Sequence, residues 1–150
     1  MTAHRWKHLN HLQVGKYAEH LVKMELTRLG CDVYSAEVDD KGIDFVLRTC
    51  TRRYLDVQVK ALRGLGYTYL KKHGQELRPD LLVALVLLRE EEAPAVFLIP
   101  STELNRRDAL FGGSDFVGKK SRPEWGIRVS KKSLPLLEPF RLDAVQESLR

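Results

Sequence analysis

The alternation of apolar and polar positions predicts one long helix followed by a series of strands. Residues 14–29 place apolar side chains at intervals of three and four, the spacing of one side of an amphipathic helix, and Gly30 follows as a stop signal. In residues 43–49 and 54–61 apolar and polar positions alternate, as they do in half-buried strands. The short connection at residues 50–53 predicts that these two strands form a β-hairpin.

The second half of the chain is expected to hold further strands and a helical C-terminus. Residues 81–88 and 95–99 are continuously apolar, which predicts strands covered on both faces. The other expected elements are a ragged strand at 31–38, a turn at 39–42, a short strand at 67–70, a helix start after Pro100 capped by Ser101 or Thr102, a mobile loop at 111–123, a strand at 125–130 and a helix or helix pair at 134–149. Together they predict a single α/β domain over residues 1–150.

The composition is that of an ordinary soluble protein. Hydrophobic residues make up 43% of the chain and charged residues 30%. No apolar run is long enough to span a membrane, and the N-terminus has no apolar signal region, so we expect a cytoplasmic protein with no membrane partner. Cys31 and Cys50 form no metal motif and are expected to be reduced structural thiols.

Residues 1–12 are expected to form a surface segment or N-terminal arm ahead of the first helix. His4, His8 and His11 lie there together with Trp6, at a spacing that would also suit the start of a helix. A metal site built from these histidines is the weaker interpretation, because no Cys or acid completes a ligand set.

The net charge is +5, and the basic residues gather in two stretches. Within residues 48–78 and 118–132, Lys and Arg far outnumber Asp and Glu. Solvated surface explains either stretch alone about as well as phosphate binding does, but both flank the candidate site described next. The candidate nucleic-acid-binding residues are Arg63, Lys71, Lys72, Lys119, Lys120 and Arg122.

The two central strands place three polar side chains on one face. Alternate side chains of a strand share a face, so Gln58 and Lys60 project together, away from the apolar residues that alternate with them. If the hairpin turn is centred near Thr51, the residue numbers of two positions that pair across the strands sum to about 102. Asp44 then lies opposite Gln58, with Cβ atoms roughly 5 Å apart. The pattern therefore predicts a cluster of Asp44, Gln58 and Lys60.

Glu19 is the fourth candidate, because it lies on the predicted helix in line with the apolar residues Val22 and Leu26, one turn after Gly15. Glu19 and Asp44 could supply hard oxygen ligands for Mg²⁺, together with the amide oxygen of Gln58 or the carbonyl of Val59. Such an ion stabilises charge on a scissile phosphate, and Lys60 could orient the attacking water. Together, these groups could catalyse phosphodiester hydrolysis. A cross-strand salt bridge between Asp44 and Lys60, and a solvated carboxylate at Glu19, are the structural alternatives.

This pattern resembles the PD-(D/E)xK nuclease superfamily. The matching features are Gly15-Lys-Tyr-Ala-Glu19 in a first helix, Gly42-Ile-Asp44 at the opening of a strand, and Val57-Gln-Val-Lys60 in the next strand. The Gln-x-Lys form of the motif is similar to the branch that contains a cyanobacterial group I intron homing endonuclease, as are the apolar strands at 80–88 and 96–100 and the Trp125-Gly-Ile127 segment.

The resemblance implies a restriction-endonuclease-like core, with a central mixed β-sheet flanked by helices. It implies that Asp44 is the motif aspartate, Lys60 the motif lysine and Glu19 the first-helix acid, while Gln58 replaces the usual acid. It also implies Mg²⁺, with Mn²⁺ as a substitute, held by Glu19, Asp44 and Gln58, and a homodimer or homotetramer that acts on double-stranded or branched DNA. Asp56 shares the face of Gln58 and is a conceivable substitute acid.

Two classes of function remain open at this point. The first is a metal-dependent DNA endonuclease of homing or restriction type, with Glu19, Asp44, Gln58 and Lys60 as catalytic residues. The second is a nuclease-fold module that binds nucleic acid or protein without cutting, and the absence of an acid at position 58 motivates it. An enzyme that acts on RNA is a third and weaker interpretation.

Overall fold

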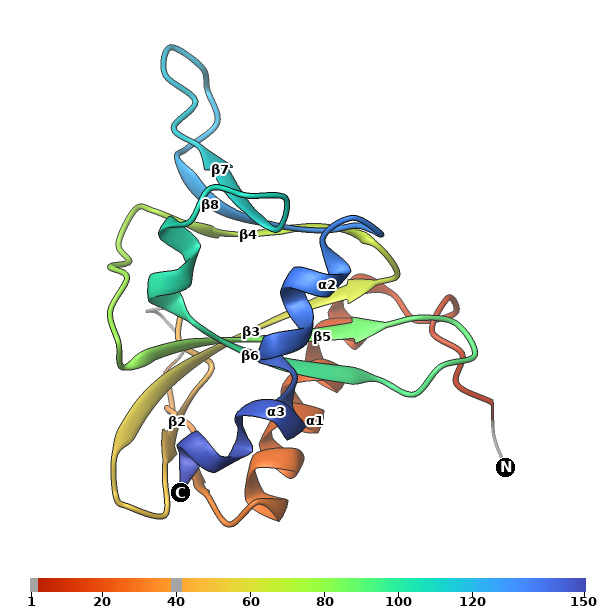
Figure 1. Cartoon of the computed structure of the whole chain (residues 1–150), viewed down its shortest axis with the longest axis vertical. Helices are drawn as coiled ribbons and strands as arrows, with labels where there is room; N and C mark the ends of the chain where they lie inside the picture. The colour runs from red at the N-terminus through yellow and green to blue at the C-terminus, as the bar shows by residue number, and fades with distance from the viewer. Residues whose placement is uncertain (1–2, 39–41) are drawn as a thin grey trace.

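The computed structural model describes residues 3–38 and 42–150. Two sheets and a small number of helices make up the fold (Figure 1). The first sheet has five strands in the order β1-β2-β3-β5-β6, and the second has three in the order β4-β8-β7. The strands are β1 (Asp32–Tyr34), β2 (Phe45–Arg48), β3 (Tyr54–Arg63), β4 (Gly66–Lys71), β5 (Leu81–Leu88), β6 (Ala95–Pro100), β7 (Phe111–Ser114) and β8 (Glu124–Val129).

The five-stranded sheet is mixed, as predicted. β3 runs parallel to β5, and the other neighbouring strands are antiparallel. All eight residues of β5 are buried, which confirms that this apolar run is a strand covered on both faces. Among the described residues, no helix is long and apolar enough to cross a membrane.

Helix α1 (His11–Arg28) covers one face of this sheet. It begins three residues earlier than the apolar pattern predicts, because Asn10 and Gln13 form a capping box. Val14, Ala18 and Val22 are buried against alternate residues of the sheet. The helix ends as predicted, since the next residues turn at Gly30, whose φ of +91° is a left-handed conformation.

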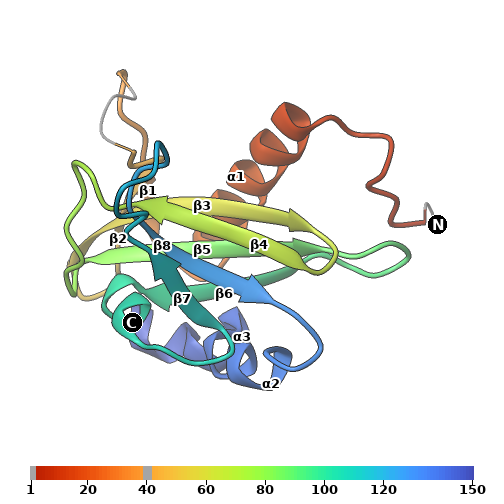
Figure 2. The same ribbon diagram turned by 90° about the horizontal axis from the view of Figure 1, so that it is seen from above.

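The other face of the sheet is covered mainly by the three-stranded sheet, as Figure 2 shows from above. Leu70 of β4, Phe111 of β7 and Ile127 of β8 are buried against Val83 and Leu85 of β5. The core therefore has two layers, one beneath α1 and one beneath the second sheet.

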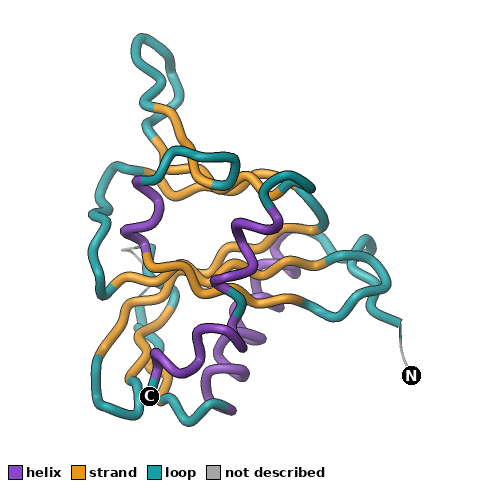
Figure 3. The backbone as a smooth tube through the Cα atoms, viewed as in Figure 1, coloured by secondary structure: helices purple, strands orange, loops and turns teal. Residues whose placement is uncertain are grey.

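The C-terminal segment wraps around the β6 edge of the first sheet. It consists of the short helical pieces α2 (Leu134–Leu137), η2 (Glu138–Phe140), α3 (Leu142–Val145) and η3 (Gln146–Leu149), drawn in purple near the C-terminus in Figure 3, and the extended residue Arg141 separates η2 from α3. Leu137 packs into the layer beneath the second sheet, whereas Leu142 packs into the layer beneath α1. The prediction of helical structure at 134–149 is confirmed, although it consists of short pieces in place of a long helix or helix pair.

Three local predictions are wrong. The strand expected at 31–38 ends at Tyr34, because residues 35–38 are exposed and leave the sheet. The loop expected at 111–123 contains β7, which buries Phe111 and pairs with β8, so only residues 115–123 form a loop. Ser101 caps no helix; it begins the 3₁₀ helix η1 (Ser101–Asn105) and uses its hydroxyl elsewhere. The turn expected at 39–42 lies largely outside the described residues.

The N-terminal segment packs more closely than an exposed arm. Trp6 is buried in the layer beneath α1, and its indole Nε1–H donates to the Arg89 carbonyl at 3.0 Å. The carboxylate of Glu90 accepts hydrogen bonds from the backbone N–H groups of Trp6 and Lys7. The expectation of a surface segment is therefore wrong for Trp6, although His4 and His8 are exposed or nearly so.

Candidate functional site

The candidate site lies where β2 begins beside the middle of β3. The hairpin register is the predicted one, since Phe45 pairs with Val57 and Arg48 with Tyr54, and each pair of positions sums to 102. Asp44 lies one residue before the ladder begins. Its backbone N–H donates to the carbonyl of Val57 at 2.9 Å, so the chain leaves regular pairing at Asp44. The end of the ladder thus brings this aspartate against the edge of β3.

The carboxylate of Asp44 binds the backbone of β3. Its Oδ2 accepts a hydrogen bond from the N–H of Val59 at 2.6 Å. Within a strand, the N–H and C=O of one residue point to the same side. The carbonyl of Val59 is therefore directed to the side on which Asp44 lies, and two hard oxygen donors meet at this edge.

Gln58 and Lys60 share the opposite face from α1. Their parallel partners in β5 are Val83 and Leu85, both buried beneath the second sheet, so the two polar side chains lie on the side of the first sheet that carries the second. An open cavity of about 570 Å³ is lined by Gln58 and Lys60 together with Tyr69 and Lys71 of β4 and residues of the loop that follows it. The prediction that Gln58 and Lys60 share one face is confirmed.

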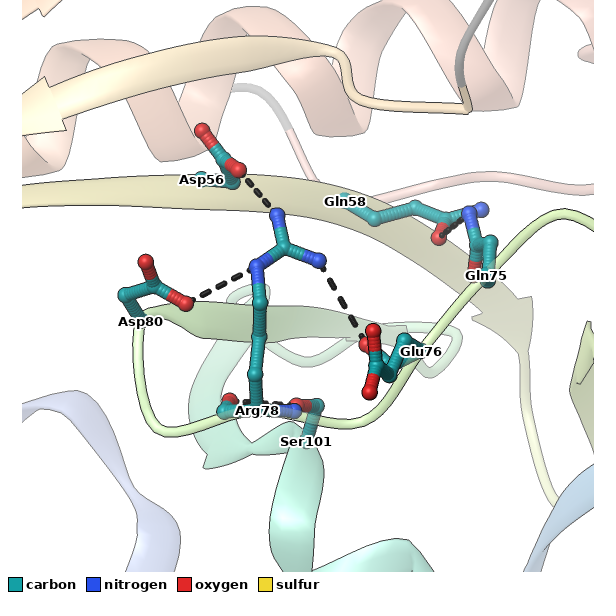
Figure 4. Close-up of polar contacts among 7 residues, drawn as sticks. All are labelled: Asp56, Gln58, Gln75, Glu76, Arg78, Asp80 and Ser101. Atoms are coloured by element: carbon teal, nitrogen blue, oxygen red, sulfur yellow. Dashed lines mark hydrogen bonds and ion pairs between the residues drawn. The ribbon is translucent and has the colours of Figure 1, made fainter.

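A second amide, Gln75, engages Gln58. The Nε2–H of Gln75 donates to Oε1 of Gln58 at 2.9 Å, which fixes the orientation of the Gln58 amide (Figure 4). The other polar atom of Gln75, its Oε1, is buried and has no hydrogen-bond partner among the described residues. Gly42 completes the contact, because a Cβ at this position would lie 2.5 Å from Nε2 of Gln75. Its φ of +70° also favours glycine.

Lys60 lies in a setting that disfavours its positive charge. Burial lowers the pKa of Lys60 below its ordinary value; Asp44 opposes this shift, and Lys71 adds to it. The Lys60 ammonium also lies 5.9 Å from the ring centroid of Tyr69, within cation–π range. The pKa of Lys60 therefore depends on an attracting carboxylate, Asp44, and on a repelling ammonium, Lys71.

This coupling predicts how the pKa of Lys60 responds to its neighbours. In the metal-free protein, Lys71→Gln should raise the pKa of Lys60, because a repelling charge is removed, and Asp44→Asn should lower it, because an attracting charge is removed. An NMR titration that follows the side-chain signals of Lys60 measures both shifts. Lys119→Gln, at an exposed position of the loop at 115–123 whose charge does not shift the pKa of Lys60, is the matched control and should leave that pKa unchanged.

Glu19 stands apart from these three side chains. It belongs to α1, on the other face of the sheet, and forms ion pairs with Lys23 at 3.0 Å and Lys16 at 3.6 Å. Partial burial acts to raise the pKa of Glu19, but Lys23 and Lys16 outweigh it and hold the pKa below its ordinary value. The ammonium of Lys23 lies 5.6 Å from the ring centroid of Phe45, the residue after Asp44. A ligand role for Glu19 stays a prediction.

Asp56, the candidate substitute acid, is engaged by an arginine. The guanidinium of Arg78 pairs with Asp56 and, through Nε, with Asp80 at 2.8 Å (Figure 4). The hydroxyl of Ser101 accepts from the backbone N–H of Arg78 at 3.0 Å and donates to its carbonyl at 2.8 Å. Ser101 thereby anchors the loop that carries both Arg78 and Gln75. Asp56 is thus neutralised by a held cation, which favours Asp44 as the ligand.

Loss of the Ser101 hydroxyl should destabilise this loop. Ser101 is fully buried, so Ser101→Ala leaves the N–H of Arg78 without its partner and removes one of two hydrogen bonds to the Arg78 carbonyl, which also accepts from the N–H of Leu81 at 3.1 Å. The free energy of unfolding should fall by about 1–3 kcal/mol. Urea unfolding measures the change. Thr102→Ala, at the exposed next position, is the control and should cost no more than about 0.5 kcal/mol. Equal effects of the two changes would contradict the anchoring role.

The predicted nucleic-acid-binding residues fall into three groups. Lys71 lines the cavity beside Lys60. Arg63 donates to the Leu9 carbonyl, and Lys72 pairs with Asp115 at 2.7 Å and lies over the ring of Trp125. The loop at 115–123 carries the three remaining candidates, all exposed, and it projects away from the body of the fold in Figure 1: Lys119, Lys120 and Arg122. Their contacts with phosphate stay predictions.

The donor set fits a hard divalent cation. Asp44, the Val59 carbonyl and the Gln58 amide offer oxygen atoms, which Mg²⁺ prefers, and the unpartnered Oε1 of Gln75 adds a fourth oxygen close to Gln58. No group of three or more His, Cys, Asp or Glu side chains suited to a metal ion occurs among residues 3–38 and 42–150. A metal held here would therefore depend on amide and carbonyl oxygens as well as on Asp44.

The sequence pattern missed Gln75, Arg78 and Tyr69. Gln75 and Arg78 lie between β4 and β5 in a segment with no periodic apolar pattern, so nothing in the sequence predicted that it folds back over β3. Tyr69 alternates with the buried Leu70 in β4, and that alternation is the one signal that could have placed it on an open face.

Comparison with known proteins identifies two nucleases whose structures resemble this fold. No known protein family and no curated protein matches the sequence. Solved structures similar to it include a homing endonuclease and a Holliday junction resolvase. The homing endonuclease I-Ssp6803I, from a bacterium, shares 18% identity with a TM-score of 0.53 over 90% of this chain and 89% of that one. The Holliday junction resolvase Hjc of Archaeoglobus fulgidus shares 17% identity with a TM-score of 0.51 over 81% and 88%. The chain thus has a nuclease fold, as the resemblance implied.

Proposed function

We propose that this chain is a metal-dependent endonuclease that hydrolyses phosphodiester bonds in DNA. The observation that carries the proposal is the cluster of Asp44, Gln58 and Lys60 at the junction of β2 and β3, in a fold shared with two nucleases. Asp44, the Val59 carbonyl, Gln58 and Glu19 are the proposed ligands of Mg²⁺ or Mn²⁺, and Glu19 would exchange its ion pairs with Lys23 and Lys16 for the ion. The bound ion would neutralise charge on the scissile phosphate and lower the pKa of a coordinated water.

The side chains of this site have separable tasks. The Val59 N–H fixes the carboxylate of Asp44, and Gln75 fixes the amide of Gln58, so both oxygen donors are oriented before any ligand arrives. Lys60 lines the cavity and interacts electrostatically with Asp44, so its ammonium can bind a non-bridging phosphate oxygen and orient the attacking water. Lys71 adds positive charge to the same cavity.

Double-stranded or branched DNA is the proposed substrate. One structural neighbour is a homing endonuclease and the other a resolvase of Holliday junctions. The exposed cations Lys119, Lys120 and Arg122 would contact phosphates beyond the cleavage site, and Arg63, Lys71 and Lys72 those nearer to it. We further propose that the protein is a homodimer or homotetramer, because one active site cuts one strand and a duplex has two strands. Light scattering measures the oligomer. We also propose a cytoplasmic location.

A nicking assay tests the proposed activity. The full chain is incubated with supercoiled plasmid and with a synthetic four-way junction, in Mg²⁺, in Mn²⁺ and in EDTA. We expect metal-dependent cleavage of at least one DNA, little cleavage of a matched RNA duplex, and none in EDTA. Lys60→Ala should slow cleavage by about 10²–10³-fold. Cleavage that persists in EDTA, or that is unaffected by Lys60→Ala, would contradict the proposal.

One observation favours a second candidate, a nuclease-fold module that binds DNA without cutting it. The amide oxygen of Gln58 already accepts a hydrogen bond from Gln75, and an amide supplies no charge to a metal. Calorimetric titration separates the two candidates. Heat of Mg²⁺ binding at millimolar concentration that disappears in Asp44→Asn supports the enzyme. Retained DNA affinity with no metal binding supports the binding module.

A further inference from the structure

A second concavity, distinct from the candidate catalytic cavity, lies on the outer face of the three-stranded sheet. Its volume is about 570 Å³, and its lining includes Tyr67 of β4, Gly112 of β7 and Arg128 of β8. Tyr67 pairs with Arg128 in the ladder, so their side chains share the face that points away from the buried core. Its size is within the range of small-molecule sites.

Tyr67 is held as a rigid aromatic platform. Its ring lies directly on Gly126, where a Cβ would come within 2.5 Å of ring atom Cε2. Its hydroxyl donates to the carboxylate of Glu124. Burial together with this carboxylate raises the pKa of Tyr67 to about 12, so the phenol keeps its proton and the hydrogen bond persists at neutral pH. The exposed guanidinium of Arg128 lies 4.9 Å from the ring centroid and adds a flat cationic surface.

The floor of this concavity is open backbone. A Cβ at Gly112 would meet no atom within 4 Å, so the space above the glycine is unfilled. Gly112 faces Gly126 across the ladder, and the pair removes side chains from the centre of the sheet face. A flat group can therefore lie on the sheet beside Tyr67.

The charges of this face suit a nucleotide. The two acids of the lining are engaged, since Glu124 accepts from Tyr67 and Asp108 pairs with Arg106 at 2.9 Å while accepting from backbone N–H groups. Arg128 and Lys132 are exposed at the same concavity. Aromatic and guanidinium surfaces stack on bases, and nearby cations bind the backbone phosphates.

We propose that this concavity binds an unpaired nucleobase of the DNA substrate, stacked on Tyr67 and Arg128. The inference rests on the proposed function, because it makes the occupant part of the DNA that the site cuts. Tyr67 and Tyr69 stack with ring centroids 6.2 Å apart, and Tyr69 is the ring beneath the Lys60 ammonium. A tyrosine pair thus links the two cavities, and two aromatic rings, Tyr67 and Tyr69, would lie between a base in the second cavity and Lys60. Preference for DNA with an unpaired nucleotide follows.

Fluorescence of 2-aminopurine tests the base pocket. The full chain, in EDTA so that no cleavage occurs, is titrated into two duplexes, one with 2-aminopurine as an unpaired bulge and one with it fully paired. We expect tighter binding of the bulged duplex and quenching of its fluorescence. Gly112→Val fills the floor, and Arg128→Ala removes the cationic surface. Each should weaken bulge binding by about 5- to 100-fold and leave binding of the paired duplex within twofold. Arg128→Lys, which keeps the charge but not the plane, should weaken bulge binding similarly.

The outcomes separate this inference from the proposed nuclease activity. A bulge preference that Gly112→Val abolishes supports the pocket even if the nicking assay finds no cleavage. Equal binding of the two duplexes by wild type overturns the pocket even if the protein cleaves plasmid. An unchanged bulge preference in folded Gly112→Val, with folding checked by circular dichroism, also overturns it. If Gly112→Val does not fold, Tyr67→Leu takes its place, with Tyr67→Phe as the control that keeps the ring.

Discussion

Replacing Asp44 with asparagine should abolish DNA cleavage, with a loss of about 10³-fold or more in the rate constant. The change is nearly isosteric, and the amide oxygen of asparagine can still accept the hydrogen bond from the Val59 N–H. The fold is therefore retained, and the loss reflects the missing negative charge beside Lys60 and at the metal. Single-turnover cleavage at saturating Mg²⁺ measures the effect.

Asp56→Asn is the matched control for this change. Asp56 lies on β3 and pairs with Arg78, so the same substitution there removes an acid that is already neutralised. Its cleavage rate should remain within about tenfold of wild type. A large loss for Asp56→Asn together with a small loss for Asp44→Asn would contradict the assignment and make Asp56 the catalytic acid.

Replacing Gln58 with glutamate should tighten the binding of Mg²⁺ by roughly 10- to 100-fold, because a second unit charge then lies close to the ion. The substitution keeps the size of the side chain, and a carboxylate oxygen still accepts from Nε2 of Gln75. Calorimetric titration measures the affinity. Cleavage at limiting Mg²⁺ should rise with it.

Gln146→Glu is the control for added negative charge. Gln146 lies in the C-terminal 3₁₀ helix η3, on the edge of the fold formed by β6 and the last helices. It should leave the affinity for Mg²⁺ unchanged. Equal effects of the two substitutions would mean that Gln58 does not face the ion, and weaker binding in Gln58→Glu would mean the same.

The sequence predicts the scaffold of the site because its periodicities are strong. The alternation in residues 54–61 and the short turn fix the register of β2 against β3, so the strand pairing that begins directly after Asp44 follows from parity and the short turn. The first helix is predicted for the same reason, because Val14, Ala18 and Val22 recur at its period. Neither inference needs long-range information.

The parts that the sequence does not predict depend on contacts between distant segments. Gln75 reaches Gln58 because the buried hydroxyl of Ser101 holds the backbone of Arg78, and no local propensity encodes that contact. The strand β7 contains Gly112 and Gly113 and looks like a loop, yet pairing with β8 and burial of Phe111 overcome its poor strand propensity. Tertiary packing decides both cases.

Anomalous diffraction from a crystal of the wild-type protein soaked in Mn²⁺ tests the central claim most directly. We predict one ion at the junction of β2 and β3, with the carboxylate of Asp44 and the carbonyl of Val59 within about 2.5 Å of it and the Gln58 amide on the same side. An ion bound at another place on the protein, or no bound ion at millimolar Mn²⁺, would contradict the assignment of this site.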